Sequence, residues 1–203
     1  MRLERLPNMS ADHQWVYVIG RITLESVNVD ARLRALLATL NGRVDRDALL
    51  DPASPWTATM TGCKKRLDTV PYSEKTRTAV LGVIADAGAA WNERNRYVHD
   101  LLVETIVAED AVHPDATLTP NGHARLRIRL ARGKKKVAPD AHVVSLDQAV
   151  SFVCQLVAVK WRLQAAQGHL AGRETWNGLL FGHVTGEWDG NASWISADDD
   201  DDD

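Results

Sequence analysis

The stretch DHQWVYVIGRITLESVNVDARLRALLATL, residues 12–40, establishes the helical character of this chain. Its apolar residues recur every three or four positions, which places them on one face of an α-helix. Asn41-Gly42 follows and ends the pattern. We therefore predict a long amphipathic helix that buries this face in a core. The predicted buried face comprises Trp15, Ile19, Ile22, Ser26, Val29, Leu33, Leu36 and Leu40.

Three further segments have helical periodicity. The second predicted helix covers about residues 56–67, and the third runs from the N-cap residue Ser73 to about Ile106. The fourth begins at Ser145, which can form a capping box with Gln148. The predicted buried faces are Val80, Ile84, Ala87, Trp91, Val98 and Leu101 or Leu102 in the third helix, and Phe152, Leu156, Val159, Leu163 and Ala166 in the fourth.

Residues 107–144, between the third and fourth helices, follow a different pattern. The segment 124–130 alternates strictly between basic and apolar residues, which is the period of a β-strand. Residues 133–136 are suited to a turn, and residues 141–144 can form the returning strand. We therefore expect a mainly α protein, an antiparallel four-helix bundle with a β-hairpin inserted between helices three and four.

The chain is predicted to have one domain and a tail. The domain covers residues 12–170, and the tail, residues 171–203, has scattered tryptophans, is expected to be poorly ordered and ends in an acidic run. The formal net charge of the 203 residues is −3, but six of the acidic residues are Asp198 to Asp203. Without them the chain has 21 acidic and 24 basic residues, so its body is slightly basic and permits an anionic partner.

Several protein classes are disfavoured by the composition. No apolar run is long enough to span a bilayer, and the N-terminus lacks the apolar core of a secretory signal, so we expect a cytoplasmic protein without membrane contact. Cys63 and Cys154 form no CxxC pair and are expected to be small core residues. The histidines have no metal-ligand spacing, so neither a metal nor a cofactor is predicted.

The hexapeptide Arg94-Asn95-Arg96-Tyr97-Val98-His99 is the strongest candidate for chemistry. On a helix, Asn95 and His99 lie on the same face, one turn apart. Arg94 falls on the apolar stripe between Trp91 and Val98, where a guanidinium group needs an anion or an interface. An arginine can hold a phosphate, and a histidine can transfer a proton near neutral pH.

This hexapeptide resembles the motif of the HEPN superfamily, in which an arginine is followed, after four to six residues, by a histidine near the end of a long helix. Arg94, Asn95 and His99 match the form with four intervening residues. The resemblance implies a metal-independent endoribonuclease that acts as a homodimer, with an RNA substrate and, in a toxin–antitoxin or phage-defence setting, an antitoxin protein as partner. It implies that His99 is the general acid/base, that Arg94 holds the scissile phosphate, and that Asn95 orients them.

Two alternatives to catalysis remain open. Many HEPN-like domains are inactive modules that bind nucleotide, RNA or protein, and this chain could be one of them. The hexapeptide could instead be structural, a solvated helix face with Glu–Arg pairs and a partly buried histidine. Glu25, midway along the first helix, could face the motif inside the bundle.

The inserted segment contains a second set of candidate RNA-binding residues. A basic strand face and a lysine turn can follow an RNA backbone through charge alone. Alternatively, the bases belong to an exposed hairpin and protect an edge strand from aggregation. The aspartates at the end of the chain could fold back on this hairpin. The candidate RNA-binding residues are Arg125, Arg127, Arg129, Lys134, Lys135 and Lys136.

Overall fold

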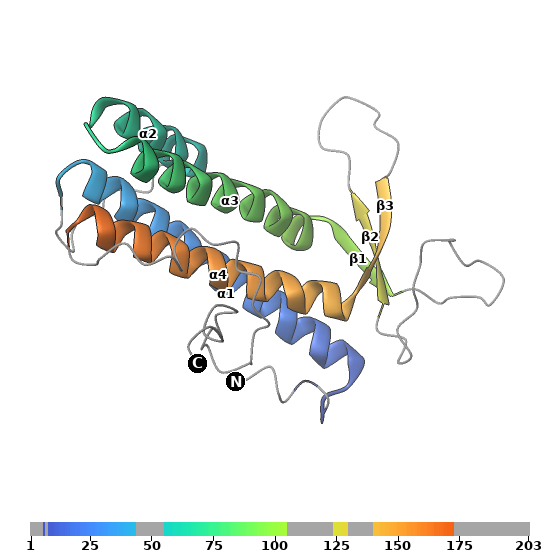
Figure 1. Cartoon of the computed structure of the whole chain (residues 1–203). Helices are drawn as coiled ribbons and strands as arrows, with labels where there is room; N and C mark the ends of the chain where they lie inside the picture. Colours follow the sequence, from blue (N-terminus) through green and yellow to red (C-terminus); the bar gives the residue numbers. More distant parts are fainter. Residues whose placement is uncertain (1–5, 7, 44–54, 105–123, 130–139, 173–203) are drawn as a thin grey trace, which may run out of the picture.

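A computed structural model of the chain describes residues 6, 8–43, 55–104, 124–129 and 140–172. This part of the chain is mainly α-helical, with a small antiparallel sheet at one end of the helices (Figure 1). The predicted fold class is therefore confirmed at the level of a mainly α protein. The elements are α1 (Ala11–Leu40), α2 (Trp56–Thr69), α3 (Glu74–His99), β1 (Leu101–Glu104), β2 (Ala124–Arg129), β3 (Asp140–Ser145) and α4 (Leu146–Leu170).

The directions of the helices differ from a simple antiparallel arrangement. α3 runs antiparallel to α4, since Tyr97 near its end stacks on Phe152 and Asp86 nearer its middle pairs with Arg162. α1 and α4 both begin beside the sheet and run in the same direction (Figure 1). These two parallel helices form the largest helix–helix contact among the described elements. The antiparallel expectation therefore holds for α3 and α4 but not for α1 and α4.

The core follows the predicted faces closely. In α1 every predicted residue is buried except Ile19, which is partly buried, and Val18 is buried beside it. All five predicted residues of α4 are buried. In α3 the buried stripe continues to Tyr97, whereas Trp91 and Val98 are only partly buried. Each fully buried leucine or isoleucine contributes about 2–3 kcal/mol through the hydrophobic effect, so these faces hold the helices together.

Local signals define the helix ends as the sequence predicts. The Ser73 side chain accepts a hydrogen bond from the backbone of Thr76 at the start of α3. Ser145 and Gln148 form the complete capping box of α4. α1 ends at Leu40, and Gly42 adopts φ +73°, a left-handed conformation that favours glycine.

The sheet has three strands, in the order β1-β2-β3, instead of the two of a hairpin. The predicted pairing of β2 with β3 is confirmed, with Arg127 opposite His142. The prediction that the third helix continues to Ile106 is wrong, because Leu101–Glu104 forms β1 and pairs with β2. Pairing with a neighbouring strand outweighs the helical periodicity of these residues, since helix propensity is a weak preference. As a result, β2 is the central strand and not an edge strand.

Some predictions concern residues outside the described ranges. They include the lysine turn with Lys134, Lys135 and Lys136, most of the inserted segment, and the tail from residue 173 to the acidic run. The backbone of Arg129 is described as part of β2, but its side chain is not. None of the helices that the structure describes is long and apolar enough to cross a membrane.

Candidate functional site

Arg94 lies in the penultimate turn of α3 and is held in place by its neighbours. Its guanidinium group lies over the ring of Trp91, 5.0 Å from the centroid, and Trp91 in turn stacks on Trp56 of α2. Nη1 of Arg94 donates a hydrogen bond to Oδ1 of Asn95 at 3.0 Å. Nε is buried and has no hydrogen-bond partner within the described residues. Arg94 is therefore oriented by protein contacts while part of its donor capacity stays unused.

His99 is the last residue of α3 and is exposed. Asn95 and His99 lie one turn apart on the same side of the helix, as predicted. Arg94 and His99, five residues apart, differ by about 140° around the helix axis. The structure thus brings Arg94 and Asn95 into direct contact, whereas His99 projects from another side of the same helix end.

The basic face of β2 packs against the helices. Arg125 and Arg127 are only 9% and 6% exposed, so the expectation of an exposed basic face is wrong for these two residues. Arg125 forms an ion pair with Asp12 at the start of α1. Arg127 forms one with Glu93 of α3. Acidic partners on two helices therefore compensate the charges that the sequence pattern assigned to a surface.

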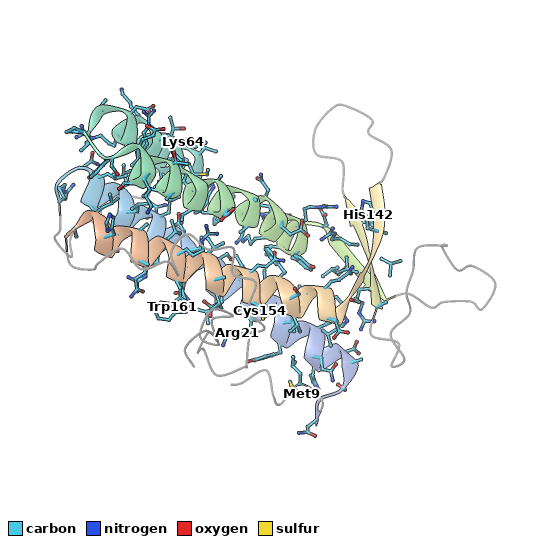
Figure 2. All side chains as sticks on the ribbon, viewed as in Figure 1. Met9, Arg21, Lys64, His142, Cys154 and Trp161 are labelled. Carbon is cyan, nitrogen blue, oxygen red and sulfur yellow. The ribbon has the colours of Figure 1, made fainter. Side chains whose placement is uncertain are left out.

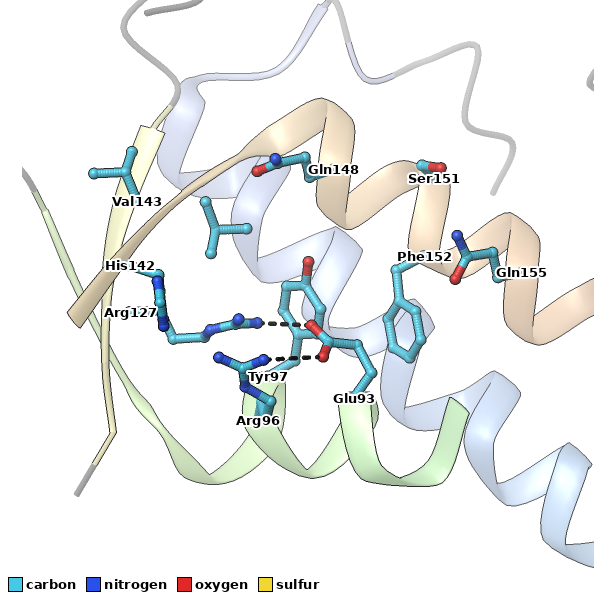
Figure 3. A pocket seen from close by; sticks show the side chains of 11 residues that line it. Glu93, Arg96, Tyr97, Arg127, His142, Val143, Gln148, Ser151, Phe152 and Gln155 are labelled. Carbon is cyan, nitrogen blue, oxygen red and sulfur yellow. Dashed lines mark hydrogen bonds and ion pairs between the residues drawn. The ribbon is translucent and has the colours of Figure 1, made fainter. Parts of the chain in front are cut away.

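An open groove of about 500 Å³ lies between the end of α3, the sheet and the start of α4. We call it the α3–α4 groove. Its charged wall is formed by Glu93 and Arg96 of α3 and Arg127 of β2 (Figure 3). His142 of β3 also lines the groove (Figures 2 and 3). None of Arg94, Asn95 and His99 lines it.

The charged wall is built around one carboxylate. Glu93 accepts a hydrogen bond from Nη1 of Arg127 at 2.9 Å through Oε1, and its Oε2 lies 3.5 Å from Nη1 of Arg96 (Figure 3). The Arg127 guanidinium group also lies over the ring of Tyr97, 5.2 Å from the centroid. The Nε atoms of both arginines are buried without a hydrogen-bond partner in the described part of the chain.

Tyr97 is part of the groove floor together with Phe152, and their rings stack with centroids 5.2 Å apart. Burial raises the pKa of the Tyr97 hydroxyl to about 12, more than the nearby charges of Arg127 and Arg96 lower it. The hydroxyl therefore stays protonated at neutral pH and serves as a hydrogen-bonding group, not as a base.

The wall opposite the arginines is polar and uncharged. It consists of Gln148, Ser151 and Gln155, which are exposed at one-turn spacing along α4 (Figure 3). Oε1 of Gln148 accepts the backbone hydrogen bond of the α4 capping box. The groove therefore combines cationic donors on one side with amide and hydroxyl groups on the other.

Glu25 belongs to a separate charge cluster. It is 4% exposed and bonds to Arg21, Asn28 and Lys160 of α4, so its partners are not the residues of the motif. Burial raises the pKa of the Glu25 carboxyl, but the hydrogen bonds from Lys160 and Asn28 and the charges of Lys160 and Arg21 together outweigh this effect. The pKa of Glu25 therefore lies below its usual value.

The described residues contain no group of three or more side chains suited to hold a metal ion. Both cysteines are free; Cys63 is buried, as expected of a core residue, whereas Cys154 is partly buried. Burial raises the pKa of the Cys63 thiol to about 12, which makes it a poor nucleophile.

The sequence pattern pointed to Arg94, yet Arg96, Glu93 and Tyr97 line the groove. A signal for Tyr97 was present, because Val83, Ala87, Ala90 and Tyr97 fall at helical spacing on one face of α3, and all four are buried. A signal for the neutral wall was present in the spacing of Gln148, Ser151 and Gln155. No local signal links either set to Arg127.

The comparisons with known proteins do not assign this site. No family model matches the chain, and neither a curated protein nor a solved structure matches it. Its function therefore has to be inferred from the residues and contacts described above.

Proposed function

We propose that this protein is a metal-independent endoribonuclease of the HEPN type that acts as a homodimer. The observation that carries the proposal is the state of Arg94, which is partly exposed and is oriented by Trp91 and Asn95. An arginine prepared in this way suits a phosphate group that arrives with a substrate. His99, exposed at the adjacent helix end, supplies a group for proton transfer.

In the proposed reaction the ribose 2′-oxygen attacks the neighbouring phosphorus, and the bond from phosphorus to the 5′-oxygen breaks. His99 removes the proton of the 2′-hydroxyl and protonates the leaving 5′-oxygen. Arg94 binds the phosphate oxygens and stabilises the charge that develops on them. Asn95 orients Arg94 through the hydrogen bond between their side chains. The products are a 2′,3′-cyclic phosphate and a 5′-hydroxyl end.

A second copy of the chain is part of this proposal. Arg94 and His99 lie about 140° apart around α3, so a single helix does not direct both side chains at one phosphate. Two copies whose α3 ends face each other would surround one RNA strand with two sets of the motif. We propose a HEPN-like four-helix bundle for α1–α4, with the parallel α1 and α4 as a departure from the antiparallel form.

A catalytically inactive HEPN-like module that binds nucleotide, RNA or protein is the second candidate. It is favoured by the lining of the α3–α4 groove, which includes Arg96 and Arg127 but neither Arg94 nor His99. The cellular setting that we propose for either form is a cytoplasmic toxin or defence system with an antitoxin protein as partner.

The test is incubation of the purified protein with total RNA in the presence of EDTA. We expect cleavage that leaves cyclic-phosphate ends, and a loss of about 100-fold or more in His99→Ala and Arg94→Ala. His13→Ala, an exposed histidine at the start of α1, is the matched control and should cleave normally. RNA binding without cleavage would support the inactive module. Unfolding of His99→Ala would support a structural role, and in that case His99→Gln should restore folding without activity.

A further inference from the structure

The α3–α4 groove lies on a different side of α3 from the proposed catalytic arginine. Arg96 follows Arg94 by two residues, which turns it by about 200° around the helix. Arg96 and Arg127 both direct guanidinium groups at the groove, where Glu93 is their shared partner (Figure 3). Two arginines around one carboxylate leave the groove with net positive charge, because Glu93 is the only acidic side chain among the described residues that line it.

We propose that this groove binds one nucleotide of a single-stranded RNA, through its phosphodiester group. The charges match, since a phosphodiester carries one negative charge and the three charged side chains leave one positive charge. This binding proposal rests on the proposed RNA substrate, but the residues that carry it lie outside the proposed catalytic set. It assigns Arg96 and Arg127 to holding a flanking part of the strand.

Arg127 and Arg96 differ in how deeply they lie in the groove, and both positions suit the binding of a phosphate group. The Arg127 side chain is 7% exposed and is fixed by Glu93 and Tyr97 at the depth of the groove. The Arg96 side chain is 36% exposed and lies where a strand can reach it. Among the described residues, the hydrogen bonds and ion pairs of both arginines use only the Nη1 atoms. Because both Nε atoms are buried, Nη2 of each guanidinium group is the donor that remains for phosphate oxygens.

The opposite wall supplies what a ribose and a base require. Gln148, Ser151 and Gln155 present amide and hydroxyl groups, which can bond base edges and the 2′-hydroxyl without adding charge. α4 begins beside the groove, and the positive end of its helix dipole favours an anion there. The volume of about 500 Å³ is within the range of small-ligand sites.

The experiment measures binding of a short fluorescein-labelled single-stranded RNA by anisotropy, at several salt concentrations, with EDTA present. His99→Ala serves as the background to prevent cleavage. The groove variants are Arg96→Gln, which removes a charge, and Gln155→Glu, which adds an opposing one at an exposed position. Lys75→Gln removes a charge at the other end of α3, and Gln164→Glu adds one elsewhere on α4, as matched controls.

We expect both groove variants to weaken RNA binding about five-fold or more at low salt, and the controls to bind normally. Arg96→Gln should also lower the slope of log affinity against log salt by about one, as expected for the loss of one phosphate contact. Unchanged affinity and slope in folded groove variants would overturn the proposal.

A competition arm distinguishes the source of the phosphate. If adenosine 5′-monophosphate binds and this binding depends on Arg96, while RNA does not bind, the groove is a site for a free nucleotide. That result would overturn the RNA proposal. The catalytic proposal fails separately. Cleavage that persists in His99→Ala contradicts it, whereas groove variants that bind normally contradict only the groove.

Discussion

Nη1 of Arg127 donates a hydrogen bond to Oε1 of Glu93 over 2.9 Å, between residues 34 positions apart in the chain. The contact joins the central strand β2 to α3 one residue before Arg94. Together with the position of Arg127 over Tyr97, it fixes the end of α3 relative to the sheet. This helix end carries Arg94 and His99 on two different sides, and neither of them lines the α3–α4 groove.

Arg127→Met should therefore destabilise the protein by about 1–3 kcal/mol, because it leaves Glu93 with the weaker Arg96 contact alone and removes the guanidinium contact with Tyr97. Urea denaturation followed by circular dichroism measures the change. The control is Arg77→Met, since Arg77 and Asp68 form an exposed ion pair that should contribute less than about 1 kcal/mol. Equal losses of unfolding free energy in the two variants would show that burial does not strengthen the ion pair of Arg127.

Glu25 should make the stability of the fold depend on acid pH. Its pKa is below the usual value of 4.5 in the folded protein, so the charged cluster stabilises the fold above that pH. This contribution is lost as the pH falls through the folded-state pKa, because protonation removes the charge that Lys160 and Arg21 require.

Glu25→Gln should accordingly lower the free energy of unfolding by about 1–3 kcal/mol near neutral pH, and the difference from wild type should shrink in acid. Urea denaturation on both sides of pH 4.5 measures this. Glu74→Gln, at an exposed acid of α3, should change stability by less than about 0.5 kcal/mol. A difference that stays constant with pH would contradict the argument.

Two glycines of α1 and its end should respond to alanine in opposite directions. A Cβ atom at Gly20 meets nothing within 4 Å, so Gly20→Ala should stabilise the helix by about 0.5–1 kcal/mol. Gly42 has φ +73°, so Gly42→Ala should destabilise by roughly 1–2 kcal/mol. Thermal melts compare the two variants. A lower melting temperature for Gly20→Ala than for wild type would contradict the open space around this position.

The capping box of α4 provides a further test. Ser145→Ala removes the hydrogen bond to the backbone of Gln148 and should cost about 1 kcal/mol. Ser10, at the N-cap of α1, makes no side-chain capping hydrogen bond, so Ser10→Ala should have a smaller effect. Guanidinium titrations of both variants provide the comparison, and a larger loss for Ser10→Ala would contradict it.

The helices were predictable because their signals are local. Apolar spacing, Ser145 with Gln148, and Asn41-Gly42 act within one or two turns, and these elements agree with the structure in type and nearly in their ends. Leu101–Glu104 was not predictable in this way. Leu101 or Leu102 fits the helical stripe, and only the partner strand β2 gives this segment an extended conformation.

The candidate site was predictable in part for the same reason. The shared face of Asn95 and His99 on α3 follows from helix phase alone, whereas the end of α3 at His99 does not. The burial of Arg125 and Arg127 does not, because their acidic partners Asp12 and Glu93 belong to other elements of the chain. An alternating basic strand is typical of a solvated face until such partners are known.

The sequence by itself determined the four helices, the pairing of β2 with β3 and the place of the motif in α3, since each depends on neighbours in the chain. Only the tertiary structure decided that α1 and α4 run parallel, that β1 joins the sheet, and that Arg127 joins Arg96 at Glu93 on one wall of the groove. These features depend on which distant surfaces meet, and burying an arginine is favourable only where a carboxylate from another element compensates its charge.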